Sequence, residues 1–488
     1  MELESLIVRE DDILRKALEN LNNSGLATLF VIDKENILVG ILTDGSIRRS
    51  LLSNYGLDSI VSKVMKTSFI SFPVNTDNAL ILAAINDSVK VIPLVDENNR
   101  LVDYASANRI RRISIAAPLL TGNELAYVTD CIKTSWISSQ GKYVRQFEEM
   151  FSTYHNGYHA LAVSNGTVAL HLALVALNIG PFDEVIVPDL TFAASVNAIL
   201  YTGAVPILID VELDTWNLDT KKIEASITSR TKAIMPVHLY GNPCKMNQIM
   251  EIAKKHKLLV IEDCAESLGS YYNGQPVGVF GDAATFSFYG NKTITTGEGG
   301  MIVFKDAEIA ERAAMLRDHG MNKTKRYWHE EVGYNYRLTN IQAAIGVAQF
   351  ERLDEFVTAK RQIAKTYNET LSKASEYFEI PSENNGTVNS YWLYTCIVKS
   401  SAPFNREDLS NYLNKKGIET RPVFYPMHVM PPYANFGKVE DLANSQYISD
   451  CGISLPSSVN LSKLEVAYVC KSMTTFIESY KLANGIGE

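Results

Sequence analysis

The middle of the chain alternates between short apolar runs and longer amphipathic stretches. DEVIVPDLTF (183–192) and TKAIMPVHLY (231–240) are rich in the β-branched residues typical of strands. GTVALHLALVAL (166–177) and IMEIAKKHKL (249–258) repeat apolar residues at helical spacing. This alternation over residues 114–350 predicts an α/β domain, in which helices cover both faces of a doubly wound, mainly parallel sheet.

The pattern changes after this region. FERLDEFVTAKRQIAKTYNETL (350–371) combines helical periodicity with mixed charges. We expect a long linking helix here, followed by a smaller α+β domain. The second part of the chain, 351–488, is therefore predicted as linking helix plus small domain.

The first hundred residues contain an internal repeat. FVIDKENILVGILTDGSIRR (30–49) matches PLVDENNRLVDYASANRIRR (93–112), with Asp33 opposite Asp96. Each copy predicts a strand, an acidic turn, a second strand and the start of a helix. One such unit cannot bury its apolar face alone, so we expect the two copies to pack together as an α+β domain over residues 1–113.

Composition excludes several classes of protein. The 488 residues carry a net charge of −9, which does not fit a nucleic-acid-binding surface. No apolar run is long enough to predict a membrane span, and the first residues do not resemble a signal peptide. The six cysteines and eight histidines show neither disulfide nor metal-ligand spacing. We therefore expect a cytoplasmic protein with no membrane span, no nucleic-acid partner and no metal site.

A small-residue turn is the first candidate for chemistry. Ser164-Asn165-Gly166-Thr167 stands between a predicted strand and a predicted helix. Free N–H groups and the helix dipole at such a turn bind phosphate. Taken alone, ordinary helix capping explains the turn better, and it lacks the glycine pattern of dinucleotide and nucleotide loops.

Two further residues complete a possible site. Asp263 ends the apolar strand predicted at 258–261, where it could bind a metal, a ribose or a pyridinium nitrogen. Lys292 lies 29 residues later, after Ser287 and before a glycine-rich turn. A phosphate cradle, an acid and an amine suit the phosphate, the ring nitrogen and the aldehyde of pyridoxal 5′-phosphate. A lysine near the pyridinium and the phosphate would be driven towards its neutral form, which is the form that makes a Schiff base.

The order of these motifs resembles a known family. SNGTVAL, PDLTF, VHLYGNP, IEDCAES, GDAATFSFYGNKTITTGEGGM and GYNYRLTNIQAAIG occur in the order found in the DegT/DnrJ/EryC1/StrS family, from about Ile115 to the end of the chain. The resemblance implies a fold-type-I, pyridoxal-phosphate-dependent sugar aminotransferase. Some members of this family are dehydratases that replace the lysine by histidine. This chain keeps Lys292, which favours transamination.

The resemblance also implies roles for individual residues. Lys292 would form the Schiff base with the cofactor, and Asp263 would pair with its ring nitrogen. Glu266 stands near the ring hydroxyl, where the family often has glutamine. The phosphate and the ring face would be held by the remaining cofactor residues, Gly166, Thr167, Ser287 and Phe192, although a phenylalanine after a strand is more often a core residue.

Substrates and assembly are implied as well. The amino donor would be L-glutamate, and TSWISSQGKYV and RYWHEEVGYNYRLTNIQAA resemble most the branch that converts GDP-4-keto-6-deoxymannose to GDP-perosamine for surface polysaccharides. A UDP-linked keto sugar is the alternative. Asn335 would reach the cofactor phosphate of a neighbouring subunit in a homodimer. Arg421 would meet a carboxylate or phosphate unless it forms an ordinary salt bridge, and His329 and His428 would touch the substrate unless they are surface or core histidines.

The N-terminal repeat resembles a tandem pair of CBS domains, which often bind adenine nucleotides. Thr43 and Asp44 keep the ribose-binding pair of the first copy, whereas Ser106 and Ala107 replace it in the second. The alternatives are a pair that binds nothing, a pair that only assists assembly, and a nucleotide sensor attached to a degenerate enzyme. The intact Asp263, Ser287 and Lys292 set argues against degeneration.

Overall fold

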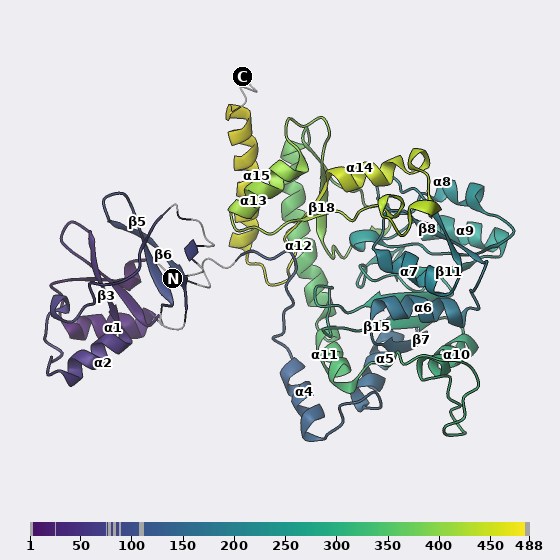
Figure 1. Cartoon of the computed structure of the whole chain (residues 1–488), viewed down its shortest axis with the longest axis horizontal. Helices are drawn as coiled ribbons and strands as arrows, with labels where there is room; N and C mark the ends of the chain where they lie inside the picture. The colour runs from purple at the N-terminus through teal and green to yellow at the C-terminus, as the bar shows by residue number, and fades with distance from the viewer. Residues whose placement is uncertain are drawn as a thin grey trace. The chain divides into compact units, whose positions relative to one another are not determined.

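The computed structural model describes residues 3–24, 26–74, 76, 80–81, 84–86, 89–106 and 112–483. The chain divides into two compact units, Met1–Arg112 and Ile113–Glu488 (Figure 1). This division lies one residue from the boundary expected from the sequence. Ile113 belongs to the second unit because its N–H donates to the carbonyl of Gly417 at 2.9 Å.

The first unit contains two three-stranded sheets of the same design. In each, an outer strand pairs in parallel with the middle strand, and the middle strand pairs antiparallel with the last. The first sheet comprises β1 (Ile7–Arg9), β2 (Thr28–Ile32) and β3 (Leu38–Thr43), and the second comprises β4 (Phe72–Pro73), β5 (Val91–Val95) and β6 (Leu101–Ser106). The helices whose full bounds fall within the described residues of this unit are η1 (Leu3–Leu6), α1 (Leu14–Ser24), α2 (Asp44–Leu52) and η2 (Val61–Lys63).

The repeat seen in the sequence is also a structural repeat. Asp33 accepts two backbone N–H bonds in the turn before β3, and Asp96 accepts the equivalent two before β6. Asn36 and Asn99 have the same left-handed φ, 63° and 59°, within these turns. Ser106 ends β6, and Ala107, expected at the next helix start, lies outside the described residues.

The second unit is built on a seven-stranded sheet in the order β7-β15-β14-β11-β10-β8-β9. β15 runs antiparallel to both of its neighbours, β7 and β14, while the other six strands share one direction, so the sheet is mainly parallel, as predicted. Its strands are β7 (His159–Val163), β8 (Glu184–Pro188), β9 (Val205–Ile209), β10 (Thr231–Ile234), β11 (Leu259–Asp263), β14 (Ala283–Ser287) and β15 (Gly300–Phe304).

Both faces of this sheet are apolar and covered. Along β15, Ile302 and Phe304 join one core cluster, whereas Met301 and Val303 join the cluster on the opposite face. Successive side chains of a strand point to opposite faces, so a strand buried on both sides shows no polar alternation. The surrounding helices are α4 (Glu124–Lys133), α5 (Lys142–Tyr154), α6 (Gly166–Ala176), α7 (Ala193–Tyr201), α8 (Thr220–Ile223), α9 (Met246–His256), α10 (Ala307–Arg317) and α11 (Asn340–Phe350).

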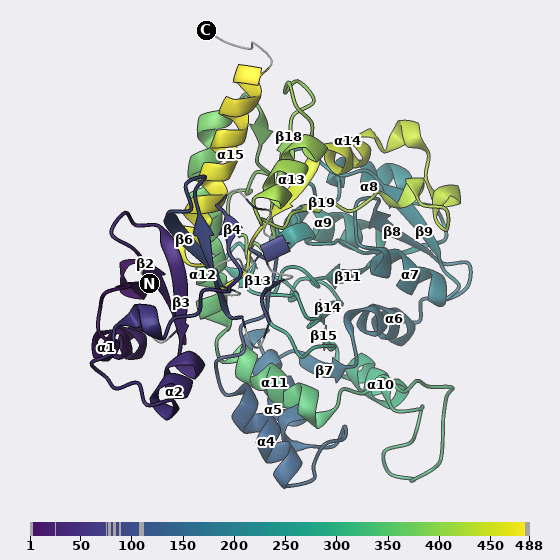
Figure 2. The ribbon, with the colours of Figure 1, turned by 60° about the vertical axis from the view of Figure 1, so that its left-hand side comes forward.

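The linking helix and small domain also form. The predicted helix is α12 (Leu353–Leu371), separated from α11 by a short turn. A four-stranded antiparallel sheet, β16-β18-β20-β19, packs against α12 and α15, and Figures 1 and 2 both show α15 beside α12. The elements are β16 (Phe378–Glu379), β18 (Tyr394–Val398), β19 (Arg421–Pro422), β20 (Gly452–Leu455), α13 (Arg406–Lys415), α14 (Ala443–Cys451) and α15 (Lys463–Ala483), with a small separate sheet of β12 (Tyr271–Tyr272), β13 (Gln275–Pro276) and β17 (Thr387–Val388).

Across the described residues, no helix combines the length and the apolar character needed to cross a membrane.

Candidate active site

A cavity of about 690 Å³ opens where several strands of the large sheet end. It brings together residues from the ends of β11 and β14, from the starts of α6 and α7, and from the small domain. Ligands of α/β proteins bind at this edge of the sheet. The predicted site residues that line it are Gly166, Thr167, Phe192, Asp263, Glu266, Ser287, Lys292 and Arg421.

Asp263 is held rigidly at the end of β11. One carboxylate oxygen accepts the hydroxyl of Ser195 at 2.7 Å, and the other accepts the N–H of Ala265 at 3.1 Å. Burial raises the pKa of Asp263, while these two hydrogen bonds oppose the increase. Ser195, in the first turn of α7, is a supporting residue that the sequence analysis missed.

Lys292 and Glu266 form a buried pair in the cavity wall. The Lys292 Nζ lies 3.5 Å from a Glu266 carboxylate oxygen, and the other Glu266 oxygen accepts the N–H of Tyr240 at 2.8 Å. Burial lowers the pKa of Lys292 and raises the pKa of Glu266 to about 7. The amine is therefore easier to deprotonate than an exposed lysine, as a lysine that reacts with a carbonyl must be.

The SNGT turn and Ser287 lie close together in the cavity wall. Asn165 caps α6 by accepting the N–H of Val168 at 3.0 Å. A Cβ on Gly166 would come within 2.8 Å of the Ser287 Cβ, so glycine allows the helix start to approach the end of β14 closely. The cap confirms the helix-capping explanation of this turn. It leaves other first-turn N–H groups without an intrahelical partner, so anion binding stays a prediction.

Aromatic side chains form much of the remaining wall. Phe192, at the start of α7, is 58% exposed and its ring lies 5.6 Å from that of Phe424. It is therefore available to a ligand and is not a core residue. Trp392, which the sequence analysis also missed, places its ring centroid 3.6 Å from the Lys292 Nζ. No local pattern marks Trp392, since it enters from the small domain.

Arg421 extends into this cavity from β19. Its closest charged partner among the described residues is Glu419, at 3.5 Å, and its side chain remains 45% exposed. This pair is longer than a tight bidentate salt bridge, so both interpretations of Arg421 given by the sequence stay open.

Three other predicted residues are not among those that line the cavity. His428 is buried, and its Nδ1 lies 2.7 Å from an oxygen of Asp189, so it is a core histidine. His329 is exposed and donates from Nδ1 to the carbonyl of His319 at 2.9 Å. Asn335 is exposed and accepts a hydrogen bond from Arg337 at 2.9 Å.

In the first unit, Thr43 and Asp44 lie at the start of α2. The Thr43 side chain accepts the N–H of Ser46 at 3.1 Å in a capping box. Asp44 pairs with Arg48 one turn later on the helix. These contacts stabilise the helix start, and the ribose role of the two residues stays a prediction.

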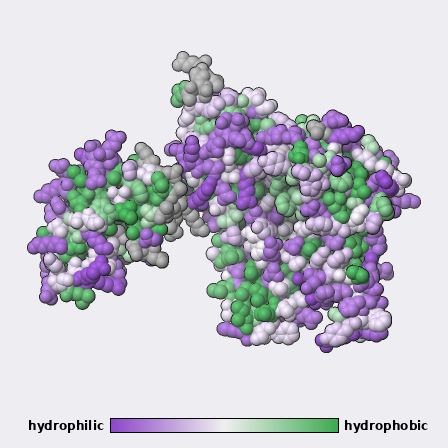
Figure 3. All heavy atoms as spheres, in the orientation of Figure 1, coloured by the Kyte–Doolittle hydropathy of each residue, from purple (hydrophilic) through white to green (hydrophobic). Residues whose placement is uncertain are grey.

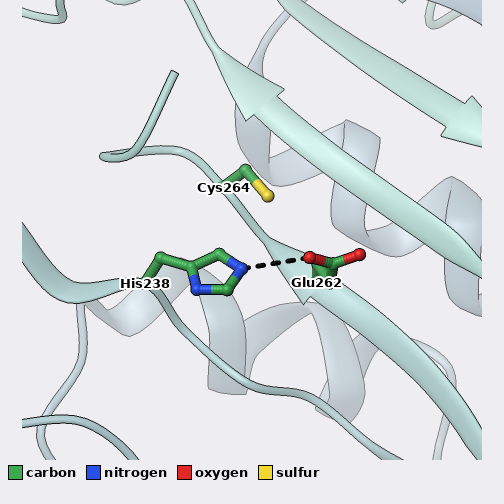
Figure 4. Close-up of side chains that lie close together, drawn as sticks. All are labelled: His238, Glu262 and Cys264. Carbon is green, nitrogen blue, oxygen red and sulfur yellow. Dashed lines mark hydrogen bonds and ion pairs between the residues drawn. The ribbon is translucent and has the colours of Figure 1, made fainter. Parts of the chain in front are cut away.

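Glu262 and Cys264, the sequence neighbours of Asp263, belong to a second buried cluster, which Figure 4 shows. His238, Glu262 and Cys264 present ligand-type atoms that lie within 4.8 Å of one another. However, the Nδ1 of His238 accepts the N–H of Cys244, so its Nε2 carries the proton and donates to Glu262 at 3.2 Å. Burial also raises the pKa of the Cys264 thiol far above its usual value. We assign this cluster a structural role.

Comparisons with known proteins identify the second unit. Residues 118–474 match the DegT/DnrJ/EryC1/StrS aminotransferase family, and residues 1–53 match the CBS domain. Over 367 residues the chain is 48% identical to GDP-perosamine synthase of Escherichia coli O157:H7, covering 75% of this chain and 99% of that protein. It is also 48% identical to GDP-perosamine synthase of Caulobacter vibrioides over 362 residues, or 74% of this chain and 97% of that one.

A solved structure shows the same fold. A putative sugar aminotransferase from Streptococcus pneumoniae in its PMP form has a TM-score of 0.72 and 28% identity, over 76% of this chain and all of that one.

The cavity fits pyridoxal phosphate on its own terms. A helix start that only glycine allows beside Ser287 suits a phosphate, a buried carboxylate suits a ring nitrogen, and a buried amine suits an aldehyde. The family match and the side chains of the cavity both indicate a pyridoxal-phosphate enzyme. The chain belongs to the DegT/DnrJ/EryC1/StrS aminotransferase family, as a pyridoxal-phosphate-dependent nucleotide-sugar aminotransferase with an N-terminal CBS domain.

Proposed function

We propose that the enzyme transfers the amino group of L-glutamate to GDP-4-keto-6-deoxymannose and so makes GDP-perosamine. The observation that carries this proposal is 48% identity along 97–99% of the length of two GDP-perosamine synthases. The alternative acceptor is a UDP-linked 4-keto sugar.

We further propose a role for each residue of the cavity. Gly166, Thr167 and Ser287 would hold the cofactor phosphate, Phe192 would cover the ring face, and Asp263 would hold a proton on the ring nitrogen. Glu266 would face the ring hydroxyl, and Lys292 would be the covalent anchor. Arg421, at the open side of the cavity, would receive a carboxylate or phosphate of the substrates.

When bound, pyridoxal phosphate supplies an aldehyde that carries amino groups and a ring that accepts electron density. The protein supplies the proton transfer. The Lys292 Nζ, when free, would take one proton from the donor's α-carbon and give it up within the same half-reaction. Asp263 keeps its orientation throughout because Ser195 and Ala265 fix both of its oxygens.

An absorption titration tests the substrate assignment. The purified protein should show the visible band of bound cofactor, and this band should bleach with L-glutamate. It should return on addition of the GDP-linked keto sugar but not of UDP-linked ones. Return with a UDP-linked sugar alone would overturn the GDP assignment while leaving the aminotransferase intact.

The Lys292→Ala substitution tests the role of the lysine. We expect loss of both the visible band and turnover, because no other amine is proposed to hold the cofactor. Lys305→Ala is the matched control, since Lys305 is an exposed lysine that follows β15. A Lys292→Ala protein that keeps the band would refute the proposed role.

We also propose a homodimer with shared active sites. Figure 3 shows an apolar area over α4, and large apolar side chains in and after this helix are strongly exposed, Leu125 at 80%, Ile132 at 62% and Trp136 at 58%. Asn335 is exposed outside its own chain's cavity lining, as a residue that serves a neighbouring subunit would be.

Hybrid dimers separate shared sites from independent ones. Lys292→Ala and Asn335→Ala chains, each impaired alone, would form one intact site when one chain of each kind associates. Mixing them after mild dissociation should therefore restore activity. No recovery in hybrids verified by mass spectrometry would contradict a shared site.

For the first unit, we propose binding of an adenine nucleotide beside Thr43 and Asp44, with an effect on the enzyme. The match of residues 1–53 to the CBS domain supports it. Turnover and thermal stability should change with AMP, ADP, ATP or S-adenosylmethionine, and Asp44→Asn should abolish the change. Indifference of the full-length enzyme to all four ligands would rule out a site for them.

A further inference from the structure

The amine of Lys292 rests on an aromatic face. Its Nζ lies 3.6 Å from the ring centroid of Trp392, well within the range of a cation–π interaction. The same amine has Glu266 at 3.5 Å. A buried ammonium group therefore has two favourable contacts here, a carboxylate and the electron-rich face of an indole.

Trp392 is fixed in this position from three directions. Its indole N–H donates to the carbonyl of Asn291, the residue before Lys292, at 2.7 Å. Its own carbonyl accepts the buried Nζ of Lys360 from α12 at 3.0 Å. Its ring lies 6.0 Å from that of Tyr240 at an angle of only 10°. Because it is also only 4% exposed, the indole cannot turn away from the amine without breaking these contacts.

We propose that the indole face of Trp392 holds the protonated amine of Lys292 whenever this amine is not bonded to the cofactor, with Glu266 as its counter-ion. This proposal rests on the role of Lys292 proposed above and extends it. A lysine that carries a proton between two carbons needs a favourable contact for its charge, because its side chain is largely buried. Trp392 supplies that place without the full charge of a second carboxylate.

Other charged groups also act on this amine. Asp263 attracts the ammonium form from the end of β11, and burial opposes that form. Glu298 and Arg421 line the same cavity with opposite charges. A test must therefore change the electron density of the indole while leaving its volume, its burial, these three groups and Glu266 in place.

Fluorinated tryptophans meet that condition. Placing mono-, di- and tetrafluorotryptophan at position 392 weakens the negative face of the ring stepwise at nearly constant shape. The readout is the pKa of the Lys292 amine in the cofactor-free protein. It is obtained by acetic anhydride labelling across a pH series, with mass spectrometry of the peptide that contains Lys292. We expect a stepwise fall that reaches about one unit for the tetrafluoro side chain.

The chain contains a matched control. Lys325 places its Nζ at the same 3.6 Å from the ring of Trp328, but both side chains are exposed. Because water competes for an exposed cation, the same fluorinated residues at position 328 should change the labelling of Lys325 very little.

The outcomes are distinct. A constant Lys292 pKa along the series at position 392 would overturn the proposal, even if Lys292 proves to be the cofactor's anchor. A visible band that survives Lys292→Ala would instead remove the role on which the proposal rests. Two further variants, Trp392→Phe and Trp392→Leu, compare an aromatic with an aliphatic side chain. A Trp392→Phe protein that folds and keeps the Lys292 pKa closer to that of the original protein than Trp392→Leu does would support an aromatic effect over simple packing.

Discussion

Glu266 and Lys292 lie 3.5 Å apart with side chains that are only 5% and 13% exposed. Burial penalises the charged form of each, so it raises the pKa of Glu266 to about 7 and lowers that of Lys292. Mutual attraction opposes both shifts. Near neutral pH Glu266 can thus gain or lose a proton easily, and the lowered pKa of Lys292 suits an amine that must act in both forms.

Glu266→Gln tests this balance at the residue scale. The amide can still accept the N–H of Tyr240, but it no longer stabilises the ammonium form of Lys292. The pKa of the Lys292 amine in the cofactor-free protein should fall by about one unit or more, as measured by pH-dependent labelling. Glu298→Gln, another carboxylate of the cavity, should have a smaller effect. Equal effects of both would contradict a specific pair.

At the scale of elements, Glu262 joins β11 to the segment that follows β13. Its carboxylate accepts the N–H groups of Gly278, Phe280 and Gly281 at 2.8–2.9 Å, in addition to His238. Since Glu262 directly precedes Asp263, this network fixes the strand end that carries the proposed ring-binding carboxylate.

Glu262→Ala should therefore destabilise the second unit strongly. Three backbone N–H groups would lose their partner in the interior, at a cost of about 3 kcal/mol or more in the free energy of unfolding. Urea denaturation measures this loss. Glu251→Ala on the exposed side of α9 serves as the control and should change stability by less than about 0.5 kcal/mol. A similar stability for the two variants would refute the anchoring role.

Lys360, in α12, should make the free energy of unfolding depend on pH. It is buried and donates to the carbonyls of Trp392 and Ser457, at 3.0 and 2.8 Å, and burial lowers its pKa to about 7. Between pH 7 and its unfolded pKa of about 10.4, the unfolded chain binds more protons than the native protein. The contribution of Lys360 to the free energy of unfolding must then rise with pH across this window.

Lys360→Met should remove that rise. The difference in unfolding free energy between the original protein and Lys360→Met should become more favourable to the original as pH increases from 7 to 9.5. Lys365→Met, on the exposed side of the same helix, should show no such trend. Urea denaturation at several pH values provides the comparison. If the unfolding free energies of the two variants depend on pH in the same way, the lowered pKa of Lys360 would be contradicted.

At the scale of the whole molecule, the two compact units have separate cores. The matched region of the GDP-perosamine synthases covers nearly all of those proteins but only three quarters of this chain. The second unit therefore corresponds to nearly the full length of these relatives, and the first unit is additional to the matched region.

A chain that begins at Ile113 should thus fold and bind the cofactor with its visible band. A chain that begins at Ala117 should be less stable by about 3 kcal/mol or more, because it loses two buried isoleucines, Ile113 and Ile115, and their backbone bonds to Gly417 and Ser457. Thermal unfolding followed by circular dichroism distinguishes the two. An unfolded 113–488 fragment would show that the second unit needs the first.

Much of the fold followed from local patterns. Apolar periodicity predicted the parallel sheet and the linking helix, because each segment records in its own sequence which of its faces is buried. The N-terminal repeat followed from the match between residues 30–49 and 93–112. Asp263 was predicted as a site residue because it ends a strand, and strand ends of a parallel sheet gather at one edge. Ser287 was predicted from its place in the strand-like run before Lys292, and the structure puts both residues in the cavity wall. The roles of the histidines could not be predicted in this way, since nothing in the local sequence distinguishes the buried His428 beside Asp189 from a ligand-binding histidine.

The sequence by itself thus determined the sheet, the order of the motifs and the residues that meet at the strand ends, since these depend on spacing along a single segment. Only the tertiary structure decided that Trp392 covers the Lys292 amine and that Ser195 holds Asp263 from 68 residues away. Such contacts join segments that are distant in sequence. They depend on how the small domain and the helices pack against the sheet, and periodicity carries no information about which buried faces will meet.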